Sequence, residues 1–174
     1  MTDLDDRQAL RMADPQGMLE AVLGMPNDCR AAYDSARVVE QLPSAEGVSS
    51  MTFCGMGGSA VSGDVVRSVF LERLGLPVEV NRSPVLPEHC DSHTLVVCSS
   101  YSGNTAETLA AFRAAIKRGC RVLVVTSGGT IADEAAGHDI ATVRVPPGFQ
   151  PRAALDRSRE IVGQRDPLDQ PVFE

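Results

Sequence analysis

Three short stretches rich in glycine and hydroxyl side chains could together hold an anion. They are 55–59 (Gly-Met-Gly-Gly-Ser), 99–105 (Ser-Ser-Tyr-Ser-Gly-Asn-Thr) and 126–130 (Thr-Ser-Gly-Gly-Thr). Glycine lets the backbone approach a phosphate closely, and serine and threonine hydroxyls donate hydrogen bonds without adding charge. Each stretch precedes an expected helix, whose first N–H groups and roughly +0.5 partial charge favour an anion. The three stretches therefore predict a phosphate-binding site.

The second stretch is the most informative, because three hydroxyl groups fall within six residues at an expected helix start. They belong to Ser100, Ser102 and Thr105. The simpler alternative is a helix cap at Asn104 or Thr105, with neighbours that bind nothing. The third stretch, 126–130, is also open to explanation as turn chemistry alone.

The first stretch also matches the start of the dinucleotide-binding pattern G-x-G-x-x-G, with Ala60 in the sixth position. That pattern requires an acidic residue about 20 residues later, at the end of the second strand. Glu79 lies near that place, but within an expected strand. A dinucleotide-binding domain is therefore an alternative, although it leaves the second stretch without a role.

Between these stretches the chain alternates short, mostly apolar runs with segments of helical spacing. The runs predict strands at 51–54, 76–80, 94–98, 122–125 and 141–145. The spacing predicts helices at 18–23, 29–42, 60–74, 106–118 and 131–136. Asn27 is a candidate cap for the second of these helices, and Val61, Val65, Val69 and Leu74 lie along one side of the third.

Strands that are apolar on both faces are typical of parallel sheets covered by helices. The alternation of strands and helices predicts the α/β class, with an open, doubly wound sheet. We assign this domain to residues 43–155, a helical extension to residues 1–42, and a polar, disordered tail to residues 156–174. In such a sheet, ligands bind beyond the carboxyl ends of the strands, where all three glycine-rich stretches lie.

Composition and charge exclude several classes of function. The formal charge is −7, aromatic residues make up 4%, and Lys117 is the one lysine, so the cationic footprint of a nucleic-acid-binding protein is missing. No apolar run approaches the roughly 20 residues of a membrane span, and the acidic start does not resemble a signal peptide. We therefore expect no nucleic acid or membrane partner, and a cytoplasmic location.

The cysteines and histidines give no support for a metal site. The five cysteines form no C-x-x-C pair, and we expect them to be free thiols in a reducing compartment. His89 and His93 have i, i+4 spacing, but Pro87 and the coming strand disfavour a helix there. We expect neither a metal nor a cofactor.

Three longer segments resemble a known family. They are 55–64 (Gly-Met-Gly-Gly-Ser-Ala-Val-Ser-Gly-Asp), 99–108 (Ser-Ser-Tyr-Ser-Gly-Asn-Thr-Ala-Glu-Thr) and 146–155 (Pro-Pro-Gly-Phe-Gln-Pro-Arg-Ala-Ala-Leu). The serine-rich segment resembles sugar isomerase (SIS) domains, and its combination with Pro-Arg-Ala-Ala-Leu resembles the bifunctional phosphoglucose/phosphomannose isomerases. The likeness covers about residues 20–155. It implies an SIS-type, flavodoxin-like sheet of five mostly parallel strands with helices on both faces.

The resemblance also implies roles for individual residues. Gly58 and Ser59 would line the site of the sugar phosphate. The phosphate would be held by hydroxyl and amide donors of Ser100, Ser102 and Thr105. Arg152 matches the arginine that lies over the reacting carbons and stabilises the enediolate, which agrees with the negative charge that builds on oxygen as a proton moves between C1 and C2.

Other parts of the family pattern have no match in this sequence. The family has two SIS domains in a chain of about twice this length, and its glutamate base, histidine and lysine correspond to positions beyond residue 174. Where the family has glycine and an apolar helix after Ala-Ala-Leu, this chain continues with Asp156 and Arg157. We interpret the chain as truncated or frame-shifted before a second SIS domain. We expect an SIS domain that is inactive alone and forms a homodimer or associates with a second SIS domain.

The resemblance implies an isomerase that interconverts glucose 6-phosphate or mannose 6-phosphate with fructose 6-phosphate. A module that binds or senses a sugar phosphate without turning it over is the second alternative, beside the dinucleotide-binding domain.

Overall fold

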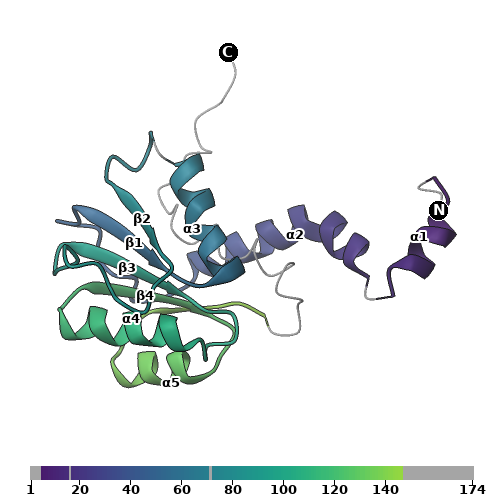
Figure 1. Ribbon diagram of the computed structural model, residues 1–174. Helices are drawn as coiled ribbons and strands as arrows, with labels where there is room; N and C mark the ends of the chain where they lie inside the picture. Colours follow the sequence, from purple (N-terminus) through teal and green to yellow (C-terminus); the bar gives the residue numbers. More distant parts are fainter. Residues whose placement is uncertain (1–4, 16, 71, 147–174) are drawn as a thin grey trace, which may run out of the picture.

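The computed structural model describes residues 5–15, 17–70 and 72–146 of the chain (Figure 1). Arg152 and the predicted tail at 156–174 lie outside the described residues.

A single parallel sheet forms the centre of the domain. Its five strands are β1 (Ser50–Cys54), β2 (Val78–Asn81), β3 (Thr94–Ser99), β4 (Arg121–Thr126) and β5 (Thr142–Arg144). They lie in the order β2-β1-β3-β4-β5, and every neighbouring pair is parallel. The predicted α/β class and flavodoxin-like sheet are thus confirmed. Because the strand order reverses between β1 and β3, a ligand is expected to bind beyond the carboxyl ends of these two strands.

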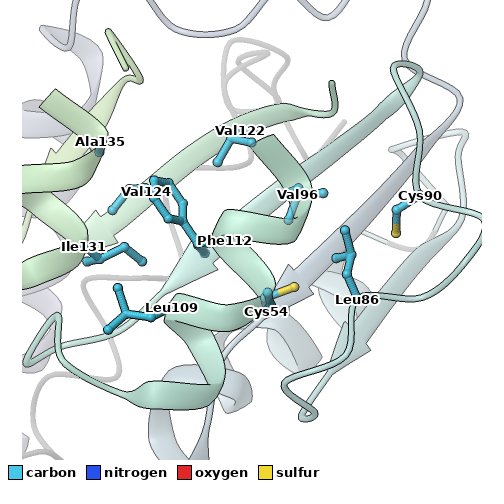
Figure 2. Packing of buried hydrophobic residues seen from close by; sticks show 13 residues of the cluster. Cys54, Leu86, Cys90, Val96, Leu109, Phe112, Val122, Val124, Ile131 and Ala135 are labelled. Carbon is cyan, nitrogen blue, oxygen red and sulfur yellow. The ribbon is translucent and has the colours of Figure 1, made fainter. Parts of the chain in front are cut away.

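Helices cover both faces of the sheet, as predicted (Figure 1). On one face, α4 (Ala106–Lys117) and α5 (Thr130–Gly137) bury Phe112 and Ile131 against β3 and β4, and Figure 2 shows this cluster. On the other face, α3 (Gly57–Val69) and the end of α2 (Met18–Arg37) pack on β1. The ends of β1, β3 and β4 therefore each lead into a helix that returns over the sheet.

The N-terminal helices differ from the prediction. Instead of two helices separated near Asn27, the chain forms one helix, α2, and Asn27 lies in its middle, so it caps nothing. Pro26 also lies inside α2. Because it has no N–H, it removes one backbone hydrogen bond of the helix, and the helix continues through it. The shorter α1 (Arg7–Ala13) precedes it, and Figure 1 shows α1 and the first half of α2 projecting away from the sheet.

The side of α3 that packs on the sheet is not the predicted side, which carries Val61 and Val69. Val61 and Val69 are 37% and 62% exposed, whereas Ala60, Gly63 and Val66 are buried. A Cβ atom at Gly63 would come within 2.7 Å of the Cβ of Phe53. The small residues Ala60 and Gly63 therefore bring the helix close to β1. Val61 and Val69 lie on the opposite, exposed side.

None of the helices in the described ranges is both long enough and apolar enough to cross a membrane.

Candidate functional site

The loops after β1 and β3 lie side by side at the carboxyl edge of the sheet. Cys54 and Cys98 are paired in register, so Gly55 and Ser99 follow on neighbouring strands. The approach is close, because a Cβ atom at Gly55 would lie 3.0 Å from the carbonyl oxygen of Ser99 and 3.1 Å from the carbonyl carbon of Ser59. Two of the three glycine-rich stretches thus meet at the reversal point of the sheet.

The N-terminus of α3 is open. Its N-cap is Met56, whose side chain makes no capping hydrogen bond. Ser59 donates its N–H to the carbonyl of Met56 at 3.1 Å, while the N–H groups of Gly57 and Gly58 have no acceptor within the described residues. Gly58 and Ser59 are both half-buried. This helix end therefore offers two backbone donors beside β3.

The hydroxyl groups of the second stretch shape a loop rather than cap a helix. Ser100 is buried, and its Oγ lies 3.0 Å from Oγ1 of Thr105 and accepts a hydrogen bond from the N–H of Gly103 at 3.1 Å. Oγ of the exposed Ser102 accepts from the N–H of Asn104 at 3.3 Å. Thr105 occupies the N-cap of α4 but its side chain makes no capping bond. The simpler cap explanation is therefore wrong for Thr105.

The N-terminus of α4 is open as well. Within the part of the chain that the structure describes, the N–H groups of Ala106, Glu107 and Thr108 have no acceptor. Oγ1 of Thr108 is also buried without a partner among the described residues. Because the α3 and α4 ends follow adjacent strands, their unpaired donors and positive partial charges can act on one anion.

Each of the other three helices has a side-chain acceptor for at least one of its first N–H groups. Asp6 accepts from two N–H groups at the start of α1, and Asp14 accepts from the N–H of Leu19 in α2, which lowers the pKa of Asp14. At α5, Asn104 Oδ1 accepts from the N–H of Thr130 at 2.9 Å, and the carbonyl of Gly103 accepts from Ile131. Among the described helices, α3 and α4 are therefore the two whose first N–H groups have no side-chain acceptor.

The third stretch supports the second one. Ser127 donates both its N–H and its Oγ–H to the carbonyl of Tyr101, at 3.1 and 2.6 Å, and the Oγ1–H of Thr126 is donated to the carbonyl of Gly128. The backbones of Gly103 and Gly128 touch so closely that a Cβ atom at Gly103 would overlap the Gly128 carbonyl oxygen. The hydrogen-bond donors of the third stretch thus hold the second stretch, the candidate phosphate loop, in place. They are not directed at a ligand.

Sequence reasoning missed two side chains in the second stretch. Asn104, considered as a cap for the helix that follows it, caps α5 instead, and Tyr101 donates its hydroxyl to the carbonyl of Pro146 at 3.2 Å. Both contacts join residues far apart in the chain. The position of an asparagine and a tyrosine within a serine-rich loop was the one signal that the sequence offered.

A family model for the SIS domain matches residues 47–150, which is more than half of the chain. The chain belongs to the SIS-domain family. Among curated relatives, the bifunctional phosphoglucose/phosphomannose isomerase of Caldicellulosiruptor bescii is 39% identical over 141 residues, or 81% of this chain and 42% of the relative. The same-named protein of Aquifex aeolicus is 43% identical over 107 residues, or 60% of this chain and 33% of the relative. The chain thus spans less than half the length of these relatives.

Other relatives show how widely this SIS domain is shared. The D-glucosamine-6-phosphate 4-epimerase of Sulfolobus acidocaldarius is 36% identical over 69% of this chain and 38% of the epimerase. In structure, the C-terminal domain of glucosamine-fructose-6-phosphate aminotransferase from Francisella tularensis superimposes with a TM-score of 0.67 at 14% identity, covering 83% of this chain and 45% of that one. The structural likeness supports the fold alone.

The end of β2 in the SIS domain does not have the acid that a dinucleotide site requires. Asn81 ends β2, and its side chain is occupied by the backbone of Ser83 and Val85. Glu79 lies two residues earlier, and its carboxylate is 3.4 Å from Nε2 of His89. The dinucleotide alternative therefore lacks its ribose-binding carboxylate at the strand end.

The five cysteines form no disulfide bond, and none of the groups of cysteine, histidine and acidic residues in the described ranges could hold a metal ion. Cys98 is fully buried on β3, and its hydrogen bond with Cys54, together with burial, raises the pKa of the Cys98 thiol well above 9. Cys98 stays protonated at neutral pH and is not a nucleophile.

Proposed function

We propose that this SIS domain binds a sugar phosphate, with the phosphate between the N-termini of α3 and α4. One observation carries the proposal: in the described residues, these two helix ends alone lack a side-chain acceptor for their first N–H groups, and they follow adjacent strands at the reversal point of the sheet. An acidic domain with a single lysine can neutralise a phosphate in this way, because backbone N–H groups supply the donors. The relatives named for sugar phosphates support the same ligand class.

The hydroxyl groups divide into two roles in this proposal. Ser102 is exposed and Thr105 is half-buried, so both can turn a hydroxyl toward the phosphate. Ser100 is buried and fixes the loop through Gly103 and Thr105. Gly58 and Ser59, at the start of α3, would contact the sugar.

For the full-length activity we propose the aldose–ketose isomerisation of glucose 6-phosphate or mannose 6-phosphate with fructose 6-phosphate. In this reaction a base removes a proton from C2 of the aldose, an enediolate forms, and C1 is protonated. The guanidinium of Arg152 is proposed to stabilise the enediolate oxygen.

We also propose that the arm formed by α1 and α2 packs against a second copy of the chain or a second SIS domain. The apolar side chains of Leu19, Val22 and Leu23 are 42%, 50% and 64% exposed on one side of α2. Their i, i+3, i+4 spacing forms a continuous stripe on the part of α2 that projects from the sheet (Figure 1). A cytoplasmic location is proposed from the buried free thiols, which persist in a reducing compartment.

A thermal-shift series tests the binding proposal. Fructose 6-phosphate at 100 times its Kd adds about 2.7 kcal/mol to the free energy of unfolding. In a domain of this size that raises Tm by roughly 5–10 °C. We expect a smaller shift with inorganic phosphate and none with fructose or NAD. A shift with NAD alone would support the dinucleotide alternative, and the absence of any shift would contradict the proposal.

A further inference from the structure

Cys54 and Cys98 lie side by side at the carboxyl ends of β1 and β3. They are partners in register on these neighbouring strands, so their side chains lie on the same face of the sheet. Both are buried in the apolar cluster beneath α4, in which Figure 2 shows Cys54. A hydrogen bond joins the two thiols. The two strands thus hold a pair of sulfur atoms in contact, one residue before Gly55 and Ser99 of the candidate site.

The spacing of these two cysteines suits a disulfide bond. Adjacent strands lie about 4.8 Å apart, and a disulfide joins Cα atoms that are about 4.4–6.8 Å apart. Register partners on adjacent strands therefore fall within this range without any change in strand pairing. No other two of the five cysteines are register partners in the sheet. The strand register therefore selects this pair.

The surroundings of the two sulfur atoms make Cys54 the more reactive of them. Its Sγ accepts hydrogen bonds from the Cys98 thiol and, at 3.8 Å, from Nδ2 of Asn81. The bond from Cys98 lowers the pKa of Cys54, because it stabilises the thiolate, whereas the same bond and burial raise the pKa of Cys98. Cys54 is also the last residue of β1, so local opening of the stretch 55–59 gives a small molecule access to it.

We propose that Cys54 and Cys98 form a disulfide bond when the chain meets hydrogen peroxide, and that this bond weakens binding at the candidate phosphate site. The Cys54 thiolate attacks one peroxide oxygen, the O–O bond breaks, and the leaving hydroxide takes up the proton that Cys54 lost, which leaves a sulfenic acid. The Cys98 proton then passes to the sulfenic oxygen while the two sulfur atoms bond, and water leaves. Two thiols are oxidised by two electrons, and peroxide is reduced to two molecules of water.

The disulfide would act on the site because it moves the two strand ends. Its Cβ atoms are held about 3.8 Å apart, which is closer than the about 4.8 Å between strands. The next residues are already in close approach, since a Cβ atom at Gly55 would lie 3.0 Å from the carbonyl oxygen of Ser99. A shift of either strand end therefore moves the starts of α3 and α4 relative to each other. This effect on binding rests on the function proposed above, whereas the disulfide itself does not.

Peptide mapping of the wild-type chain after peroxide treatment tests the disulfide. Digestion with trypsin and Asp-N separates Cys90 from Cys98, because Asp91 lies between them. We expect the peptides of Cys54 and Cys98 to be joined, with a loss of two of the five thiols and of about 2 Da, the two hydrogen atoms removed. A treated chain that keeps all five thiols, or that joins Cys54 to Cys90 instead, would overturn the proposal.

Calorimetry with fructose 6-phosphate measures the effect on the site. We expect the affinity to fall about three- to tenfold after oxidation, the worth of one hydrogen bond, and to return after reduction with dithiothreitol. Cys98→Ala should bind no less tightly after peroxide than before it. Cys120→Ala is the matched control, and it should respond to peroxide as the wild type does, because Cys120 has no register partner.

The outcomes separate the disulfide from the function proposed above. A joined Cys54–Cys98 pair with unchanged affinity would overturn the effect on the site. An equal loss of affinity in Cys98→Ala would also overturn it, since that variant cannot form the bond. A reduced wild-type chain that does not bind fructose 6-phosphate would overturn the proposed function and the effect on binding together, while the mapped disulfide would stand.

Discussion

Gly103→Ala is expected to lower the free energy of unfolding by about 2–5 kcal/mol. Gly103 has a φ of +72°, where a residue with a Cβ atom costs roughly 1–2 kcal/mol. Its added methyl group would also overlap the Gly128 carbonyl oxygen, and overpacking of this kind adds about 1–3 kcal/mol. The position of the methyl group is fixed by the backbone of residue 103, and the oxygen belongs to the backbone of Gly128. Neither can turn aside, so the second and third stretches must separate.

Gly119→Ala is the matched control for this variant. Gly119 ends the turn after α4 with a φ of +70°, but nothing lies within 4 Å of a Cβ atom built there. It should lose only the roughly 1–2 kcal/mol of the backbone conformation. Urea unfolding of the two variants measures the difference. Equal losses would show that the two stretches do not touch as described, and that the third stretch does not support the second.

The double variant Ser102→Ala/Thr105→Ala is expected to lose at least about 100-fold in affinity for fructose 6-phosphate. A hydrogen bond to a charged group contributes about 1.5–3 kcal/mol, and this variant removes two such donors. Folding should change only modestly, because Ser102 is exposed and the Oγ of Ser100 keeps its hydrogen bond from the N–H of Gly103 when its bond with Thr105 is lost. Calorimetry at constant ionic strength gives the affinity, and circular dichroism checks the fold.

Ser68→Ala/Thr142→Ala supplies the control with the same two side-chain changes. Ser68 lies near the C-terminal end of α3, away from the candidate site at its N-terminus, and Thr142 lies on the edge strand β5, which β4 separates from β3. Their hydroxyls donate to nearby backbone carbonyls. This control should bind fructose 6-phosphate as the wild type does. Unchanged affinity in Ser102→Ala/Thr105→Ala would remove both residues from the phosphate site.

The strands could be predicted from the sequence because their physical signal is local. Val122, Leu123 and Val124 are apolar on both faces, and the structure buries both faces of β4. The predicted strand ends lie within two residues of the observed ones at each strand. The start of α3 was harder to predict, since it begins at Gly57 and glycine carries little helical signal. The strand order followed from the family resemblance and not from the runs themselves.

The division of labour among the three glycine-rich stretches could not be predicted. In sequence, 55–59, 99–105 and 126–130 all combine glycine with hydroxyls before a helix. What separates them is that Gly103 and Gly128 lie in contact, where the Gly103 carbonyl and Asn104 accept from the first N–H groups of α5, while α3 and α4 have no such acceptors. Such a contact depends on how two loops meet in space, and no residue type specifies it. The role assigned to Arg152 stays a prediction.

The amide spectrum of the ¹⁵N-labelled chain during a titration with fructose 6-phosphate tests the central claim most directly. If the phosphate lies between the open ends of α3 and α4, the amide signals of Gly57, Gly58, Ala106 and Glu107 should move most, because their N–H groups gain an acceptor. The amide of Ile131 in α5 should stay in place, since Gly103 already accepts from it. Movement at Ile131 with no change at the other four amides would contradict the account.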